Sequence, residues 1–461
     1  MIDTKALRSK VLDLAIQGKL TQQLESDGTA EELYQQIQEE KQKLIKEGKI
    51  KKEKVLPPVS EEEIPFEIPR NWKWCRLGDL IKIQSGQGLT ANQMNGGSIP
   101  VYGGNGINGY HNESIIHKPT IVIGRVGVHC GSVHLTESEA WVTDNAFITT
   151  YPEHYINLSF FIYSLKFLNL GKAQNATAQP VISGKKINPL PFPLPPLAEQ
   201  KRIVERVEEI FKLLDIIDEA QKKYSADAEI LKSKLITMGI QGKLTKQLDS
   251  DGTAEELYQQ IQEEKQKLIK EGKIKATLEL PTVTDEEKLF DVPVNWKWTH
   301  FGNMAYIVRG GSPRPIKQYI TNDINGINWI KIGDVEKGGK YIFNTREKII
   351  PEGEKKSRRV YPGDFLLTNS MSFGRPYISK IEGCIHDGWL LIRNLNGFNA
   401  DYLYYLLSSS YLYAQFCNKA VGATVDNLNI EKVCSALIPL PPLAEQKRIA
   451  DTLDEVLRVI G

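Results

Sequence analysis

The strongest constraint on the fold of this chain is an internal duplication. Residues 17–51 recur at 241–275 with only two differences. A second repeat, PLPPLAEQKRI, occupies 193–203 and recurs without change at 439–449. The segments between these repeats share little sequence. The chain therefore contains two near-identical frames that carry two different inserts.

The duplication is also cyclic. The first repeat has an offset of 224 residues (241 minus 17) and the second an offset of 246 (439 minus 193). Under these offsets Gly461 corresponds to Asp215 and Met1 to Ser225, so the two chain ends together correspond to most of the central segment. A period above 200 residues with two copies indicates a pseudo-dimer, whereas solenoids have periods of about 20 to 50.

Composition is typical of a soluble globular protein of about three domains, with 461 residues, 41% hydrophobic and 25% charged. No apolar run approaches the ~20 residues that span a bilayer, and the N-terminus lacks a signal-peptide core. We therefore expect no membrane partner. The five cysteines are scattered without CxxC spacing, which favours a cytoplasmic location and neither disulfides nor a metal site.

Charge is divided between the inserts and the frame. Residues 75–192 carry +2 (8 basic minus 6 acidic) and residues 299–438 carry +5 (17 minus 12), so a net charge of +1 leaves −6 for the frame. Basic inserts favour a nucleic acid on their side of the molecule. The asymmetry is mild, and ordinary solvated surface is the alternative.

A long helix is predicted over 197–238, where the sequence lacks Gly and Pro. Apolar residues alternate spacings of four and three there, as in a coiled-coil seam, and 42 residues make a rod of about 63 Å. The two chain ends match this seam by the repeat offsets, so we expect them to form its antiparallel partners. The central seam residues are Ile203, Val207, Ile210, Leu214, Ile217, Leu231 and Leu235. Their counterparts at the chain ends are Leu7, Val11, Ile449, Leu453 and Val456.

A shorter helix follows in each frame. Thr29 and Glu32 make a T-x-x-E capping box, which is repeated at Thr253 and Glu256. Charged linkers then lead to the motif NWKW, which begins at Asn71 and again at Asn295. We interpret its tryptophans as packing residues at the entrance to each insert, with base stacking as the alternative.

Each insert is predicted to be a mixed α and β domain with its own core. Three strands and one helix are predicted in each, in the same order. In the first insert they cover 80–83, 120–123, 146–149 and 158–168, and in the second 329–332, 364–367, 389–392 and 402–407. Divergent loops on a common scaffold are typical of recognition modules, although neutral drift of an old duplicate would look similar.

The sequence contains no catalytic motif that we recognise. Gly104, Gly106 and Gly109 form a GxGxxG, but no strand-to-helix context surrounds it, and neighbouring asparagines favour a series of tight turns. No phosphate loop, zinc-protease or serine-hydrolase motif is present, nor the Asn-Pro-Pro-aromatic motif of adenine methyltransferases. We therefore expect a chain that is not itself an enzyme and that holds neither cofactor nor metal.

The two PLPPLAEQKRI boxes, each at the start of a long helix, the two G-K-L-T frames and the two unlike inserts resemble the specificity subunit of a Type I restriction-modification enzyme. The resemblance covers essentially the whole chain. It implies an α+β fold in which two globular target recognition domains are joined by long antiparallel coiled-coil helices. The implied divisions are 1–70, 71–192, 193–294, 295–438 and 439–461.

The family also implies partners. Each recognition domain would read one half of a bipartite, asymmetric sequence in double-stranded DNA. The helices would dock two modification subunits, which bind S-adenosylmethionine and methylate adenine, and restriction subunits would join to cleave. A self-contained DNA modification enzyme and a coiled-coil scaffold that binds no DNA are the alternatives.

Candidate DNA contacts are polar residues in the loops of the inserts, because base edges are read by side chains and phosphates are held by Lys and Arg. Arg125 and Arg375 are favoured, since the adjacent glycine lets backbone approach a duplex closely. For each candidate, a role in surface solubility is the alternative. The candidates are Ser85, Gln87, Asn105, Asn108, Arg125, His129, Lys185, Lys186, Arg309, Arg314, Lys317, Lys331, Arg358, Arg359, Ser370, Arg375 and His386.

Overall fold

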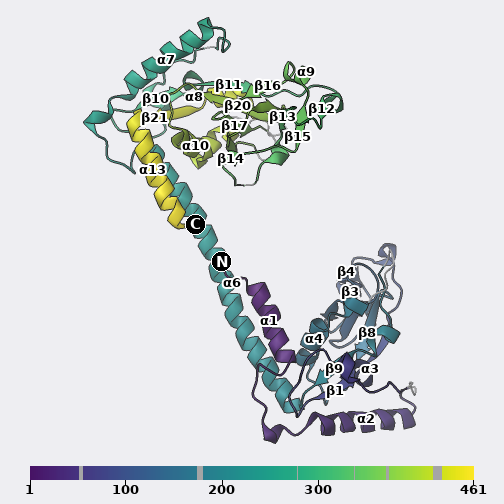
Figure 1. Ribbon diagram of the computed structural model, residues 1–461. Helices are drawn as coiled ribbons and strands as arrows, with labels where there is room; N and C mark the ends of the chain where they lie inside the picture. Colours follow the sequence, from purple (N-terminus) through teal and green to yellow (C-terminus); the bar gives the residue numbers. More distant parts are fainter. Residues whose placement is uncertain are drawn as a thin grey trace. The chain divides into compact units, whose positions relative to one another are not determined.

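Two compact units make up the protein, residues 1–222 and 223–461 (Figure 1). The computed structural model describes residues 1–50, 55–173, 180–277, 279–336, 338–369, 373–418 and 428–460. Helix α6 (Leu197–Ile240) contributes residues to both units.

The N-terminal unit contains one frame and the first insert. Its frame helices are α1 (Thr4–Ile16), η1 (Glu25–Asp27), α2 (Ala30–Lys46) and η2 (Glu61–Glu63). The main sheet has the order β2 (Lys82–Ser85), β8 (Ala146–Thr150), β5 (Ile121–Gly124) and β6 (Val133–Leu135). A smaller sheet has the order β4 (Gly106–His111), β3 (Ile99–Gly103) and β7 (Trp141–Val142). Strands β1 (Lys73–Arg76) and β9 (Pro191–Leu194) pair, and the insert helices are α3 (Leu77–Leu80), η3 (Ala91–Gln93), α4 (Leu158–Phe167), η4 (Leu170–Ala173) and α5 (Gly184–Ile187).

The C-terminal unit repeats this plan. Its frame helices are η5 (Asp249–Asp251), α7 (Ala254–Lys270), η6 (Asp285–Glu287) and α13 (Leu443–Ile460). The main sheet has the order β11 (Ala305–Arg309), β20 (Trp389–Asn394), β17 (Phe365–Thr368), β18 (Pro376–Ser379) and β14 (Tyr341–Ile342). The second has the order β12 (Ile320–Thr321), β15 (Glu347–Ile349), β13 (Ile327–Ile330), β19 (Gly383–Ile385) and β16 (Arg358–Val360). Strands β10 (Lys297–His300) and β21 (Leu437–Leu440) pair, and the insert helices are α8 (Phe301–Met304), η7 (Ile316–Gln318), η8 (Ile332–Asp334), α9 (Pro351–Glu354), α10 (Ala400–Ser408), α11 (Ser410–Asn418) and α12 (Ile430–Cys434).

The main sheets of the two inserts have the same strand order, with β2, β8, β5 and β6 equivalent to β11, β20, β17 and β18. The turn after the central strand matches in detail: the amide of Gly131 donates to the carbonyl of Gly124, and that of Gly374 to Thr368, both at 2.7 Å. Both turn glycines have a positive φ. Structurally equivalent residues can therefore be assigned between inserts whose sequences differ.

The predicted correspondence of the first strands is wrong. Residues 329–332 belong to β13 and η8, and β13 lies in the second sheet, paired in parallel with β19 as β3 is with β7. The true counterpart of β2 is β11, which the sequence pattern did not reveal. Residues 80 and 81 also precede β2, because Leu77–Leu80 forms the short helix α3. Apolar runs mark buried strands without telling which sheet a strand enters.

The repeated PLPPLAEQKRI box joins frame and insert through a buried carboxylate. The side chain of Glu199, fully buried, accepts from Trp72 Nε1 at 2.8 Å and Gln23 Nε2 at 2.9 Å. In the other unit Glu445, equally buried, accepts from Trp296 Nε1 and Gln247 Nε2, both at 2.8 Å. The first tryptophan of each NWKW motif is thus a packing residue, as predicted, and is held by the box.

The next residue of the box reaches the insert. Gln200 Oε1 accepts from the amide of Asn157, which caps α4, at 2.8 Å. Gln446 does the same for Asn399, the cap of α10, also at 2.8 Å. An identical box therefore orients both inserts on their frames in the same way.

Helices α1 and α13 lie antiparallel to the parts of α6 in their own units. Thr4 Oγ1 donates to Asp218 at 2.5 Å and Arg8 pairs with Asp215 at 2.7 Å, so residue numbers rise on α1 as they fall on α6. In the C-terminal unit the hydroxyl of Tyr224 donates to the carbonyl of Ile460, the last residue of α13, at 3.1 Å.

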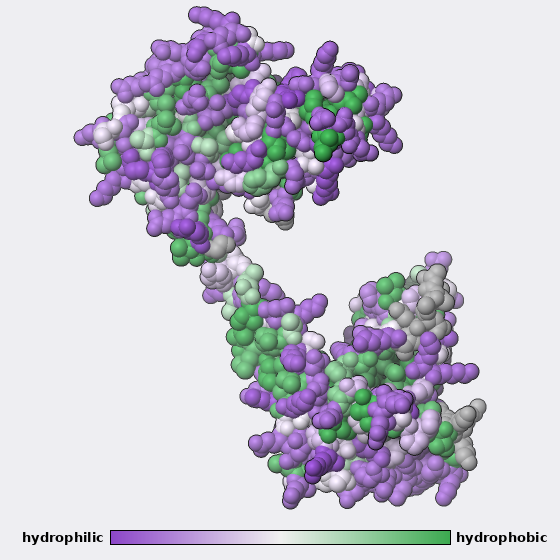
Figure 2. All heavy atoms as spheres, in the orientation of Figure 1, coloured by the Kyte–Doolittle hydropathy of each residue, from purple (hydrophilic) through white to green (hydrophobic). Residues whose placement is uncertain are grey.

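The apolar seam is packed over only part of its predicted length. Leu7 and Leu231 are 43% and 46% exposed, which corrects their assignment to a continuous buried seam. A heptad-spaced row drifts by about 20° per heptad around a straight α-helix, so it leaves a partner's face after several turns. Apolar side chains remain exposed along α6 (Figure 2). The buried seam residues are Ile203, Val207, Leu214, Ile449 and Leu453, and the half-buried ones are Val11, Ile210, Ile217, Leu235 and Val456.

Candidate nucleic-acid interface

One edge of the main sheet in the first insert carries a polar cluster, the Asp144 cluster (Ser85, Arg125 and Asp144). Arg125 Nη1 donates to Ser85 Oγ at 3.1 Å and to the main-chain carbonyl of Asp144 at 3.3 Å. The Arg125 guanidinium also lies 5.5 Å from the ring centroid of Phe147, a cation–π distance. These contacts occupy one nitrogen of the guanidinium and leave its other donors for a ligand.

The second insert has an equivalent Asp387 cluster (Arg309, Ser312, Arg314, Asn369 and Asp387). Arg309 Nε and Asn369 Nδ2 donate to the main-chain carbonyl of Asp387 at 3.2 and 2.7 Å. The amide of Arg125 donates to Asn145 O at 2.8 Å, and the amide of Asn369 to Gly388 O at 3.0 Å. Arg125 and Asn369 are therefore structurally equivalent, as are Asp144 and Asp387, yet their chemistry differs.

The carboxylate of Asp387 organises a further part of its cluster. It accepts from Ser312 Oγ at 2.8 Å and from Arg314 Nη2 at 3.3 Å. The hydrogen bond from Ser312 is the main cause of a lowered pKa for Asp387. The side chain of Arg314 is 82% exposed, and Asn369 Oδ1 is buried without a hydrogen-bond partner in the described part of the chain. This cluster thus combines an exposed guanidinium with a buried acceptor.

Glycine at position 104 allows the β3–β4 turn to lie against the turn that follows β5. A Cβ at Gly104 would stand 2.2 Å from the carbonyl oxygen of Val126, so no larger residue fits. Asn105, next to it, and Asn108 are exposed. The GxGxxG therefore contains one close-packed turn at residues 104 and 105, and its remainder lies in strand β4, so the predicted series of turns is wrong. The turn places Asn105 near the Asp144 cluster.

His386 lies beside the Asp387 cluster and, while its imidazole is neutral, accepts a backbone hydrogen bond. The amides of Gly388 and Ile332 face its two ring nitrogens, at 2.6 Å from Nδ1 and 3.1 Å from Nε2. A neutral imidazole can accept at one nitrogen, and a protonated one at neither. Burial lowers the pKa of His386 against the opposing effect of Asp387.

Acidification is therefore expected to destabilise the C-terminal unit through His386. Because the folded pKa lies below the unfolded value of about 6.5, this contribution is complete above that pH and is lost as the pH falls through the folded pKa. Thermal unfolding of the chain and of a His386→Asn variant between about pH 7.5 and 5.5 measures it. The melting temperature of the unsubstituted chain should fall more steeply, and parallel profiles would contradict this role.

Several other predicted contact residues are engaged within the protein. Lys331 pairs with Glu347 at 2.6 Å, and Arg359 pairs with Glu382 at 2.7 Å. Lys185 and Lys186 lie on α5, and His129 lies exposed in the turn after β5. Ser370 lies outside the described residues. The remaining exposed candidates are Gln87, Lys317 and Arg358.

Four cluster residues were missed by the sequence analysis: Asp144, Ser312, Asn369 and Asp387. Both aspartates stand in an Asp-Asn or Asp-Gly dipeptide immediately before a predicted strand, at Asp144 and Asp387. Such dipeptides mark turns, and this shared signal could have aligned the two inserts. Nothing in the sequence singles out Ser312 or Asn369, because their roles depend on contacts with Asp387, which is distant along the chain.

The described residues contain neither a cluster of metal ligands nor a helix suited to cross a membrane. No group of three or more His, Cys, Asp or Glu side chains within those residues could hold a metal ion. None of the helices in the described ranges is both long and apolar enough to cross a membrane.

Comparison with known proteins gives a consistent result. The family model of the Type I restriction modification DNA specificity domain matches twice, at 69–224 and 293–460. The EcoEI specificity subunit of Escherichia coli is 25% identical, over 99% of this chain and 89% of the relative. The EcoAI specificity subunit, also from Escherichia coli, is 25% identical over 98% and 89%.

Solved structures share the fold. A chain from a structure described as the basis of complex assembly and conformational transition of the type I R-M system has a TM-score of 0.59 at 16% identity, with 86% of this chain and 92% of the other covered. The HsdS subunit from Thermoanaerobacter tengcongensis has a TM-score of 0.50 at 18% identity, covering 87% and 92%. Because the family model matches both inserts and the first part of the long helix, the chain belongs to the family of Type I restriction-modification specificity subunits.

Proposed function

We propose that this protein reads a bipartite, asymmetric target in double-stranded DNA, with one insert for each half-site. One observation carries the proposal: the Asp144 and Asp387 clusters occupy equivalent positions on the same scaffold but present different side chains. Ser85 and Arg125 in the first correspond to Arg309 and Asn369 in the second. Arginine suits guanine in direct base readout. Arg125 and Arg309 stand at non-equivalent positions of the scaffold, and Asn369 is buried, so two different half-sites are expected.

The duplicated frame supports two identical partners. Helices α2 and α7 have the same sequence and the same capping box, so the chain offers the same surface twice. Two modification subunits would dock on these frames, bind S-adenosylmethionine and methylate adenine. Restriction subunits would join this assembly to cleave. The specificity chain itself would supply recognition and no catalytic group.

The proposal is tested by selecting duplexes from a randomised library with the chain assembled on its modification subunits. We expect two short, unlike conserved blocks separated by a spacer of constant length. Arg125→Ala should relax selection in one block and Arg309→Ala in the other, each by about 1–3 kcal/mol per base pair read. Enrichment of one block, or of none, would contradict bipartite reading.

A further inference from the structure

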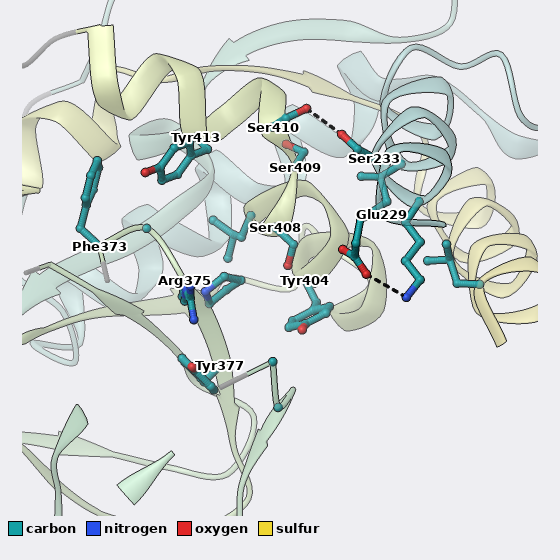
Figure 3. Close-up of a pocket in the computed structure, with 18 residues that line it drawn as sticks. Glu229, Ser233, Phe373, Arg375, Tyr377, Tyr404, Ser408, Ser409, Ser410 and Tyr413 are labelled. Atoms are coloured by element: carbon teal, nitrogen blue, oxygen red, sulfur yellow. Dashed lines mark hydrogen bonds and ion pairs between the residues drawn. The ribbon is translucent and has the colours of Figure 1, made fainter. Parts of the chain in front are cut away.

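A large pocket lies in the C-terminal unit, on the far side of the turn that carries Asn369. We name it the Arg375 pocket; its volume is about 1240 Å³. Figure 3 shows Arg375 between the ring pair Phe373–Tyr413 and Tyr404, with residues of α6 on the opposite wall. Phe373 and Tyr413 stack with centroids 5.3 Å apart. Hydroxyl groups line the remainder, from Ser233, Ser408, Ser409 and Ser410.

The N-terminal unit has a pocket at the equivalent place, the Lys166 pocket, of about 510 Å³. Both pockets are bounded by the turn after the central strand and by the end of the following helix, α4 or α10. The hydrogen-bond pattern of the turn makes Ser132 the counterpart of Arg375, since their carbonyls accept from Gly124 N and Thr368 N at 2.8 and 3.1 Å. Two inserts of unlike sequence therefore keep a pocket at one position of the scaffold.

Cations without ion pairs line both pockets. The guanidinium of Arg375 is exposed and makes no hydrogen bond or ion pair within the described ranges. Lys166 and Lys172 of the other pocket are also exposed and lack ion pairs there. In the Arg375 pocket Lys232 is partly offset by Glu229, at 3.2 Å. The two units thus place positive charge at equivalent sites with different residues.

The turn connects each pocket to a polar cluster. Asn369 of the Asp387 cluster directly follows β17 and Arg375 directly precedes β18, as Arg125 follows β5 and Ser132 precedes β6 in the other unit. We infer that the two pockets bind phosphates of the DNA backbone, while the clusters read bases. This inference rests on the proposed function. The pockets would supply the sequence-independent part of the DNA-binding free energy, and the clusters the sequence-dependent part.

The test uses the chain assembled with its modification subunits, and measures affinity for the selected duplex and for a randomised duplex of equal length. Arg375→Gln should weaken binding to both duplexes by the same factor, about tenfold, and reduce the slope of log K against log salt by about 1. The double variant Lys166→Gln/Lys172→Gln should reduce the slope by about 2. Arg375→Lys keeps the charge and should restore the slope. Lys355→Gln, an exposed cation outside both pockets, is the matched control.

Three results would overturn the pocket assignment. The first is that Arg375→Gln has the same affinity and slope as Lys355→Gln. The second is a changed base preference, which would make Arg375 a base-reading residue. The third is a loss of modification subunits from the assembly, which would make the pocket a protein-binding site. In each case the unsubstituted assembly still prefers the selected duplex. If that assembly shows no preference, the proposed function itself fails, and the two failures are thus distinguished.

Discussion

Replacing Glu199 with alanine is expected to destabilise the N-terminal unit by about 1–3 kcal/mol, because the buried indole N–H of Trp72 would lose its acceptor. The carboxylate is fully buried and accepts from Trp72 Nε1, Gln23 Nε2 and, at 3.3 Å, Thr21 Oγ1. Removal leaves the buried indole N–H of Trp72 without its acceptor, while Gln23 Nε2 still donates to the carbonyl of Gly18 at 2.9 Å. The measurement is chemical unfolding combined with hydrogen exchange of peptides from 71–192.

The second copy supplies a replicate of this experiment. Glu445→Ala should produce the same loss in peptides from 295–438, since its contacts repeat those of Glu199. Glu205→Ala, on the exposed surface of the same helix, is the matched control and should change stability by less than about 0.5 kcal/mol. Glu199→Gln keeps the shape but directs an amide toward other donors, so its effect should be intermediate. If Glu199→Ala and Glu205→Ala changed stability equally, the buried carboxylate would not be what holds the insert on its frame.

Placing a second copy of residues 295–438 in the position of 71–192 should abolish recognition of the original target. The frames are the same in both units, and Gln200 and Gln446 cap the two insert helices identically, so the transplanted insert should be held as it is in its own frame. Several base pairs of one half-site would then be mismatched, each at about 1–3 kcal/mol, so affinity for the original duplex should fall by about 100-fold or more.

Library selection with this chimera provides the readout. The duplex that this chimera prefers should contain the half-site of the second insert twice. The duplex that the reciprocal chimera prefers should contain the half-site of the first insert twice. The melting temperature of each chimera reports whether the transplanted insert is folded. An unchanged target in a folded chimera would show that the inserts do not carry specificity.

Much of the frame could be predicted because its determinants are local or repeated. The capping boxes at Thr29 and Thr253 appear as predicted, and α6 extends two residues beyond the predicted Met238. Four of the predicted insert strands lie in β5, β8, β17 and β20, each a run of mainly buried residues. These features depend on neighbouring residues, so a sequence displays them directly.

The candidate interface was only partly predictable. Ser85, Arg125, Arg309 and Arg314 were chosen as polar loop residues, and the structure brings them into two clusters. Lys331 and Arg359 were chosen on the same grounds but form ion pairs within the protein. An exposed cation and a paired one look alike in sequence, because pairing depends on side chains that are distant along the chain.

The sequence by itself determined that two copies of one frame carry two unlike inserts, because the repeats are near-identical in residue and spacing and need no folding to be seen. Only the tertiary structure decided which residues of the two inserts are equivalent. That equivalence depends on strand register and on main-chain groups, such as the carbonyls of Asp144 and Asp387, whose positions result from pairing across the sheet. A main-chain carbonyl is the same in every residue, so no sequence pattern reveals which one gathers the side chains of a site.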